Sequence, residues 1–222
     1  LNSFGNLLRL TTYGESHGQS IGGVLDGVPA GVELDHDAIQ YQLQRRRPGQ
    51  SSLTTSRNES DQFQLLSGIF EGKTTGHPIG FQIVNTDKKS DDYAHIQNTY
   101  RPSHADYTYQ QKYGIRDYRG GGRASARETA SWVLAGSIAK HIIPDISIYS
   151  FVSQIADIRY DWSYEEIDLR NIDSYRVRCP DMEVADQMTT HIKEIKSQGD
   201  SLGGIITTIV QNVPIGLGEP IF

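Results

Sequence analysis

The sequence predicts an α+β fold, in which antiparallel strands pair with one another and helices pack on the sheets. Three observations support this prediction. β-rich runs occur in neighbouring pairs, helix-like segments with apolar faces separate the pairs, and strand and helix do not alternate regularly along the chain. No low-complexity linker divides the 222 residues, so we expect a single domain over residues 1–222.

Two strands open the chain. Leu7 to Thr12 and Ile21 to Val28 are short β-rich runs, and Gly-Val-Pro-Ala-Gly closes the second one. The stretch SIGGVLDGVPAG at 20–31 is echoed by SLGGIITTIVQNVPIG at 201–216, with a spacing that differs by four residues. This echo suggests an internal duplication, with a chance similarity as the alternative.

A helix follows these strands. Asp35 is a suitable N-cap, Ile39 and Leu43 fall on one face, and the basic residues 45–47 lie where cations complement the helix dipole. Pro48-Gly49 ends the helix, because proline lacks the N–H group that a helix needs.

Two further strands are expected from Phe63 to Phe70 and from Ile79 to Asn85. The segment EGKTTGHP separates them, which predicts a hairpin with a longer loop. Lys88 to Asp92 is a polar run and is expected to form a surface loop.

The middle of the chain is expected to be helical. Ser103 is predicted to cap a short helix through Tyr109 to Lys112, and Ser125 to Ile142 is predicted to form a longer helix that Pro144 ends. Three apolar residues of the longer helix are expected to be buried: Trp132, Leu134 and Ile138.

Strand, helix and strand complete the chain. Ile146 to Ile158 is strand-like, Asp181 to Ser197 is an amphipathic helix with Gly199 as its C′ residue, and Gly203 to Val213 returns to strand.

Composition excludes several classes of protein. The net charge of −6 argues against a general nucleic-acid binder. No apolar run is long enough for a membrane span and the N-terminus lacks a signal layout, so we expect a cytoplasmic protein that binds no membrane. Cys179 is the single cysteine and zinc-type Cys-His spacing is absent, which predicts no internal disulfide and no metal site.

One stretch departs from the acidic balance. Between residues 100 and 127, six basic residues stand against Asp106 and Asp117, which suggests a small anionic ligand. The six are Arg101, Lys112, Arg116, Arg119, Arg123 and Arg127.

The same stretch contains RGGGRASARET at 119–129. Its glycines would let a ligand approach the backbone, the helix after them would point N–H groups at an anion, and Arg123 and Ser125 would add a guanidinium and a hydroxyl. One alternative is a flexible turn followed by a helix cap. Another is an RGG-type nucleic-acid segment, with tyrosines nearby for stacking.

GESHG at 14–18 matches the G-x-S-x-G nucleophile elbow of serine hydrolases, with Ser16 as the nucleophile. An elbow needs a helix directly after the serine, whereas QSIGGVLDGVP is β-like, so we rank a hydrolase low. His17 and His104 are the better candidates, because each lies at the end or the start of a predicted element, although a structural role is the alternative for both. The five other histidines are expected to be structural: His36, His77, His95, His141 and His191.

Several motifs taken together resemble chorismate synthase over almost the whole chain. They are TTYGESHG at 11–18, DGVPAG at 26–31, RRRPG at 45–49, RPSHADYTYQQKYGIRDYRGGGRASARET at 101–129, GDSLGG at 199–204 and GLGEPIF at 216–222. Their order makes the resemblance far more specific than any one motif.

The resemblance implies a carbon–oxygen lyase of the shikimate pathway of aromatic amino-acid biosynthesis. Its reaction is the anti-1,4-elimination of phosphate from 5-enolpyruvylshikimate 3-phosphate to give chorismate. The family needs reduced FMN without net redox change, and NADPH is a candidate reductant. The resemblance also implies a homotetramer and a fold with helices sandwiched between antiparallel sheets.

The resemblance further assigns roles to residues. His17 would protonate the departing phosphate, and His104 would lie against the reduced flavin and supply or stabilise a proton there. Arg123, Ala124 and Ser125 would hold FMN, and the substrate and its anionic groups would be contacted by Ser16, Arg46 and Arg127. Arg45 or Arg47 is expected instead to be a solvated helix end.

Three positions depart from the family pattern: Ser103 replaces a usual glycine, Ala124 a frequent serine, and Ser52 a frequent arginine, for which Arg57 is the candidate substitute. Family members also continue well beyond GLGEP-[IV]-F, and that part supplies more flavin contacts and a catalytic aspartate. We therefore expect this chain to lack the C-terminal part of the family, to bind FMN weakly and to be inactive alone.

Overall fold

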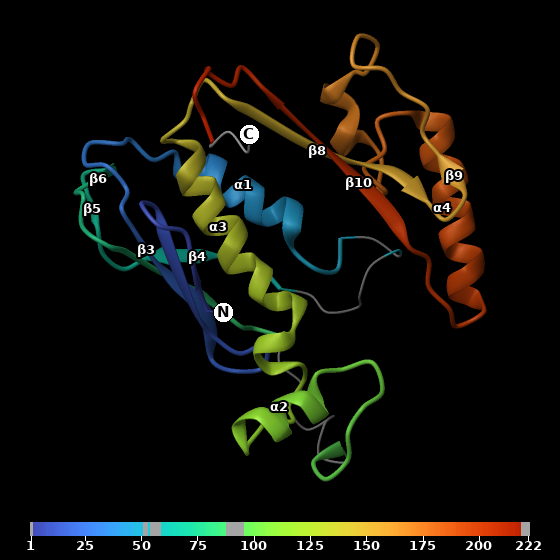
Figure 1. Ribbon diagram of the computed structural model, residues 1–222, viewed down its shortest axis with the longest axis horizontal. Helices are drawn as coiled ribbons and strands as arrows, with labels where there is room; N and C mark the ends of the chain where they lie inside the picture. Colours follow the sequence, from blue (N-terminus) through green and yellow to red (C-terminus); the bar gives the residue numbers. More distant parts are fainter. Residues whose placement is uncertain (1, 51–52, 54–58, 88–95, 219–222) are drawn as a thin grey trace. The chain divides into compact units, whose positions relative to one another are not determined.

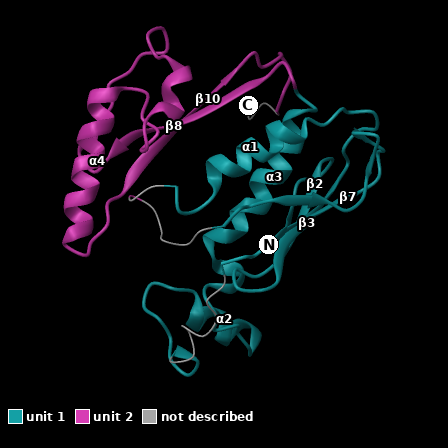
Figure 2. Ribbon diagram, turned by 180° about the vertical axis from the view of Figure 1, so that it is seen from behind, with its two compact units in different colours: residues 1–50, 56–143 teal, residues 51–55, 144–222 magenta. Residues whose placement is uncertain are grey.

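The computed structural model describes residues 2–50, 53, 59–87 and 96–218 (Figure 1). The chain divides into two compact units, residues 1–50 with 56–143 and residues 51–55 with 144–222 (Figure 2). The expectation of one domain over residues 1–222 stays a prediction. Lys88 to Asp92, Ser52 and Arg57 lie outside the described residues.

A five-stranded antiparallel sheet forms one layer of the first unit, in the order β1-β2-β3-β7-β4. Its strands are β1 (Ser3–Phe4), β2 (Arg9–Gly14), β3 (Ser20–Asp26), β7 (Ile79–Val84) and β4 (Phe63–Leu65). In β7 every second residue is fully buried, since side chains alternate across a strand: Ile79, Phe81 and Ile83. The strands predicted from Leu7 to Thr12, from Ile21 to Val28 and from Ile79 to Asn85 are confirmed as β2, β3 and β7, with shifted boundaries.

Two helices supply the second layer of this unit. α1 (His36–Arg46) and α3 (Thr129–Lys140) lie side by side, and α3 crosses β2, β3 and β7 (Figure 1). The predicted cap of α1 is confirmed, because the Asp35 carboxylate accepts a hydrogen bond of 2.9 Å from the N–H of Ala38. Ile39 and Leu43 join the sheet residues in one core, and each fully buried aliphatic side chain contributes about 1.5–3 kcal/mol.

The predicted single strand from Phe63 to Phe70 is wrong. β4 ends at Leu65, and β5 (Ile69–Phe70) pairs instead with β6 (Lys73–Thr74). Gly68 turns the chain between β4 and β5 with a φ of 78°, a conformation that favours glycine. The antiparallel pairing of β4 with β7 confirms the hairpin, whose loop holds this second small hairpin.

The helices around the glycines begin later than predicted. α2 (Asp106–Tyr113) starts after Ala105 without a side-chain cap, and Ser103 has a φ of 58°, so Ser103 is not the N-cap. Two 3₁₀ turns, η2 (Gly122–Ala124) and η3 (Ala126–Glu128), precede α3. Ser125 lies between them with extended backbone, so no α-helix begins directly after the glycines.

Burial on α3 follows the helical period. Leu134 and Ile138, four residues apart, are fully buried as predicted. Trp132 is 50% exposed, so its predicted burial is wrong. Two residues from Leu134 correspond to about half a turn, which directs Trp132 to the other face of the helix, where its ring meets that of Phe4 edge-on at 6.2 Å.

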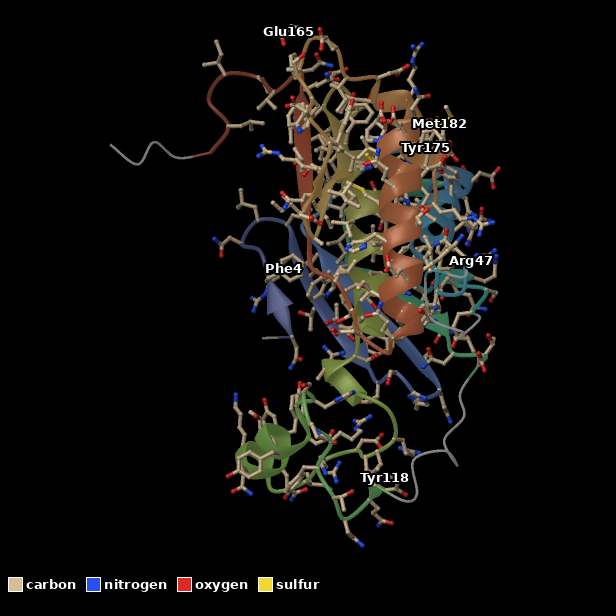
Figure 3. All side chains as sticks on the ribbon, turned by 90° about the vertical axis from the view of Figure 1, so that its right-hand side faces the viewer. Phe4, Arg47, Tyr118, Glu165, Tyr175 and Met182 are labelled. Atoms are coloured by element: carbon tan, nitrogen blue, oxygen red, sulfur yellow. The ribbon has the colours of Figure 1, made fainter. Side chains whose placement is uncertain are left out.

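The second unit contains a three-stranded antiparallel sheet in the order β10-β8-β9 and the helix α4. Its elements are β8 (Ser147–Ile155), β9 (Ile158–Arg159), the 3₁₀ turn η4 (Leu169–Ser174), α4 (Met182–Ser197) and β10 (Gly204–Gln211). Figure 3 shows the side chains of Met182 and Tyr175 near the beginning of α4.

Most predictions for the second unit are confirmed. Asp181 caps α4 by accepting a hydrogen bond of 2.8 Å from the N–H of Val184, and Gly199 follows the helix with a φ of 77°. The predicted strand 146–158 is interrupted, because Ala156 adopts a φ of 49° between β8 and β9.

The mixture of helices and antiparallel sheets confirms the α+β class. The suggested internal duplication stays a prediction. Within the described part of the chain, every helix is too short or too polar to cross a membrane.

Candidate active site

Two loops far apart in the sequence meet in the first unit. One is the β2–β3 loop, residues 15–19, and the other is the glycine turn, residues 119–125. The N–H of Ser16 donates a hydrogen bond of 3.2 Å to the carbonyl of Gly122. The structure therefore brings the GESHG motif against the triple glycine.

His17 lies directly on the glycine turn. A Cβ atom at Gly120 would be 2.1 Å from Nδ1 and 2.3 Å from Cε1 of His17, so only glycine leaves room for the imidazole. Gly120 also has a φ of 62°. The protein's own imidazole thus approaches the backbone at Gly120, and the expected approach of a ligand to the glycines stays a prediction.

Ser16 is 1% exposed, and its Oγ lies 3.0 Å from Nδ1 of His17. The strand β3 begins at Ser20, where a nucleophile elbow would have a helix. The predicted absence of the elbow context is therefore confirmed, and Ser16 is placed to orient the imidazole.

Arg123 fixes the glycine turn to the sheet. Its guanidinium donates to the carbonyl of Gly14 at 3.0 Å, to Thr12 Oγ1 at 2.8 Å and to the carboxylate of Glu128 at 2.9 Å. Burial raises the pKa of the Glu128 carboxyl against the opposing effect of Thr12 and Arg123. Glu128 Oε1 has no hydrogen-bond partner among the described residues.

A second link joins the glycine turn to the segment that carries His104. Arg101 donates at 2.7 Å to the carbonyl of Gly120 and makes two bonds of 2.9 Å with the Asp106 carboxylate. These hydrogen bonds from Arg101, together with its charge and that of Arg116, lower the pKa of Asp106 to about 2 despite burial.

His104 itself is exposed. Its Nδ1 lies 2.9 Å from the carbonyl of Pro102 and must carry a proton there, because a carbonyl only accepts. The His104 segment is therefore tied through Arg101 to the turn on which His17 rests.

Arg46 and Arg127 converge on a buried carboxylate. Arg127 is 4% exposed and pairs with Asp61, which is fully buried, while its Nε donates at 3.0 Å to Asn85. Arg46 reaches Asp61 at 3.4 Å, Thr129 at 3.2 Å and the carbonyl of Ala126 at 2.7 Å. Both guanidiniums are thus engaged by the protein.

The excess of positive charge counted between residues 100 and 127 is partly compensated in the fold. Asp106 pairs with two arginines and Asp117 with a third. Glu128 and Asp61 lie outside the counted window and pair with Arg123 and Arg127. A window along the sequence misses such partners because the fold supplies them from elsewhere.

Sequence reasoning missed Asn85 and the two acidic residues behind it, Glu59 and Asp61. The available signal was weak: a buried strand, IGFQIV, ends on a polar residue, and Asn85 is only 3% exposed. Among the described residues there is no group of three or more His, Cys, Asp or Glu side chains placed to hold a metal ion.

Comparison with known proteins gives a consistent result. A family model described as chorismate synthase matches residues 8–222. Chorismate synthases of Flavobacterium psychrophilum and Christiangramia forsetii are 60% and 59% identical over 221 residues, which is 100% of this chain and 62% of each relative. A solved structure, "Crystal Structure of Chorismate Synthase", matches with a TM-score of 0.74 and 32% identity over 94% of this chain and 60% of that one. The chain therefore spans less than two thirds of the length of these relatives.

Proposed function

Because the chain belongs to the chorismate synthase family, we propose that it carries the histidine side of a chorismate synthase active site. The reaction is the anti-1,4-elimination of phosphate from 5-enolpyruvylshikimate 3-phosphate to give chorismate, with reduced FMN required. The enzyme is then a carbon–oxygen lyase of the shikimate pathway.

One observation carries this proposal. The His17 imidazole rests on Gly120, and the carbonyl of the same glycine accepts a hydrogen bond from Arg101 in the His104 segment. Two histidines from different segments are thereby tied to one turn. Paired imidazoles suit a reaction that must protonate a leaving phosphate and manage a second proton nearby.

His17 acts as the proton donor to the departing phosphate. A general acid of this kind is the imidazolium, in which Nδ1–H donates to the Ser16 hydroxyl 3.0 Å away. In the proposed step, Nε2 releases its proton to the phosphate oxygen. Ser16 therefore contributes by orienting the ring.

His104 acts on the cofactor side. Since Nδ1 is used by the Pro102 carbonyl, Nε2 is the nitrogen that exchanges a proton with a ligand. The exposure of His104 is consistent with a group that meets a bound molecule.

The residues proposed for FMN fit it in part. Ala124 is exposed on the glycine turn, and the Ser125 hydroxyl, which accepts from the N–H of Arg127 at 3.3 Å, still has its own proton to donate. Arg123 supports the turn from behind, because Gly14, Thr12 and Glu128 occupy its donors. When bound, reduced FMN would supply the electron density that eases the departure of phosphate from a poorly acidic substrate.

Arg46 and Arg127 are the proposed anion contacts along with Ser16. The Arg46 side chain is 17% exposed and that of Arg127 is 2% exposed, so Arg46 is the better placed of the two. We further propose the homotetramer, the cytoplasmic location and NADPH as a reductant from the family, with a small-molecule substrate and no nucleic acid.

The test is phosphate release that depends on reduced FMN, measured in an enzyme of full family length that contains this chain. His17→Ala and His104→Ala should each lower kcat about 10²- to 10⁴-fold, the usual effect of lost acid–base catalysis. A fully active double variant would refute both roles. Labelling of Ser16 by a fluorophosphonate would favour a hydrolase instead, and steeply salt-dependent RNA binding would favour a nucleic-acid module.

A further inference from the structure

We propose that Asn85 is the positioning residue for His17, holding the β2–β3 loop in place through its side-chain amide. The inference rests on the catalytic role of His17 in the proposed function. It concerns a residue that touches neither imidazole nor reacting atoms and acts through the backbone on both sides of His17.

The amide of Asn85 reaches both ends of the turn that carries His17. Its Nδ2 donates to the carbonyl of Glu15 at 3.1 Å and to the carbonyl of Gly18 at 3.0 Å. The N–H of Asn85 also donates to the carbonyl of Gln19 at 3.0 Å. Three carbonyls of one short loop are therefore satisfied by one residue.

Chemistry fixes the orientation of this amide. Arg127 Nε can only donate, so the atom 3.0 Å from it must be Asn85 Oδ1. The carbonyls of Glu15 and Gly18 can only accept, so they must face the NH₂ group. Asparagine at this place has both of its N–H donors used and its oxygen engaged.

The amide is itself held by a buried ion pair. Arg127, which donates to Asn85, pairs with Asp61, and both are almost completely buried. A second arginine, Arg46, reaches the other oxygen of Asp61 at 3.4 Å. Charged partners at this depth are strongly orienting, because leaving one of them unpaired is costly. The chain of contacts from Asp61 through Arg127 thus sets the position of Asn85.

The glycine turn limits the loop from another direction. Gly122 accepts from the N–H of Ser16 at 3.2 Å, and Gly120 lies directly against the imidazole. His17 is therefore placed by a contact on its ring and by hydrogen bonds to the backbone around it. Release of the backbone should let the ring move without removing any group that meets substrate.

Asn85→Asp separates this role from packing. Aspartate keeps the size of the side chain and an acceptor for Arg127, but its second oxygen would face the carbonyls of Glu15 and Gly18 and could not donate. We expect kcat to fall about 10²-fold, the effect of a displacement on the order of 1 Å in a catalytic group, with KM nearly unchanged. The side-chain ¹⁵N resonances of His17 should move in the same variant.

Gln82→Glu is the matched control. It makes the same amide-to-carboxylate change on β7, at a half-buried side chain that bonds only Gln64 among the described partners. Its kcat and its His17 resonances should match those of the parent protein. An Asn85→Asp variant that behaves like this control in both measurements would overturn the proposal.

A measurement on the parent protein decides the case in which Asn85→Asp does not fold. The two Nδ2 protons of Asn85 should show couplings across hydrogen bonds to the carbonyl carbons of Glu15 and Gly18. Absence of these couplings would refute the proposal that the Asn85 amide holds the β2–β3 loop, and their presence would support it. If His17→Ala were fully active while Asn85→Asp shifted the His17 resonances, the proposed function would fail, but the positioning of His17 by Asn85 would stand.

Discussion

Replacement of Gly120 by alanine tests the central feature of the site, the imidazole packed on the glycine turn. The new Cβ would lie 2.1 Å from Nδ1 of His17, 2.3 Å from Cε1 and 3.0 Å from Ser16 Oγ. Overpacking of this kind costs about 1–3 kcal/mol, and a φ of 62° adds about 1–2 kcal/mol for a residue with a Cβ. The lower entropy of the unfolded chain returns about 0.4–1 kcal/mol. We therefore expect the free energy of unfolding to fall by about 1–5 kcal/mol, or a displaced imidazole with a smaller loss.

Gly122→Ala is the control for this variant. Gly122 has a φ of 53°, so alanine suffers the same backbone strain. Its Cβ, however, would meet only the carbonyl oxygen of Asp117, at 3.9 Å. Urea unfolding of both variants at one pH should place Gly120→Ala about 1–3 kcal/mol below Gly122→Ala, which is the clash alone.

The cause of that difference can be assigned to His17 by a double-mutant cycle. His17→Ala removes both ring atoms that the new Cβ would meet, so Gly120→Ala should cost no more than Gly122→Ala in that background. Equal stability of the two alanine variants in the parent protein, with unchanged His17 resonances, would refute the packing described above.

Two further predictions concern the segment around α2. Asp106 has a folded pKa of about 2, below its usual 3.8, so its ionised form stabilises the fold. This contribution to stability is complete above about pH 4 and is lost as the pH falls toward 2. Asp106→Asn should therefore lower the free energy of unfolding by about 2 kcal/mol at pH 7 and by progressively less below pH 4. Urea unfolding at several pH values checks this, and a cost independent of pH would contradict it. Ser103→Gly should be neutral or stabilise by up to about 1 kcal/mol in thermal unfolding, because Ser103 has a φ of 58° and glycine adopts it without strain. A loss above that size would show that the Ser103 side chain has a stabilising contact.

Local patterns in the sequence were enough to predict the helices α1 and α4. In both, an aspartate directly before the helix makes the predicted capping bond, and the apolar spacing predicts the buried face. Breaks inside elements were harder to predict, because Glu71, Ala156 and Ser103 adopt positive φ without being glycine. Their conformations depend on surrounding contacts more than on the residue type.

The candidate site likewise has a part that the sequence indicated and a part that it did not. The GESHG and RGGGR motifs drew attention to the two loops that meet in the structure. The support behind these loops was not predicted, because it is built from contacts across long sequence separations. Arg123 reaches Gly14 and Thr12, and Arg127 reaches Asn85 and Asp61.

The same difference limits what counting charge along the sequence says about the arginines. A guanidinium that is to bind an anion and one that fixes a loop need the same donors, and the sequence does not distinguish them. Arg123 donates to the Gly14 carbonyl, the Thr12 hydroxyl and the Glu128 carboxylate, and Arg127 donates to Asn85 Oδ1 and pairs with Asp61. These contacts show that both arginines fix loops in place.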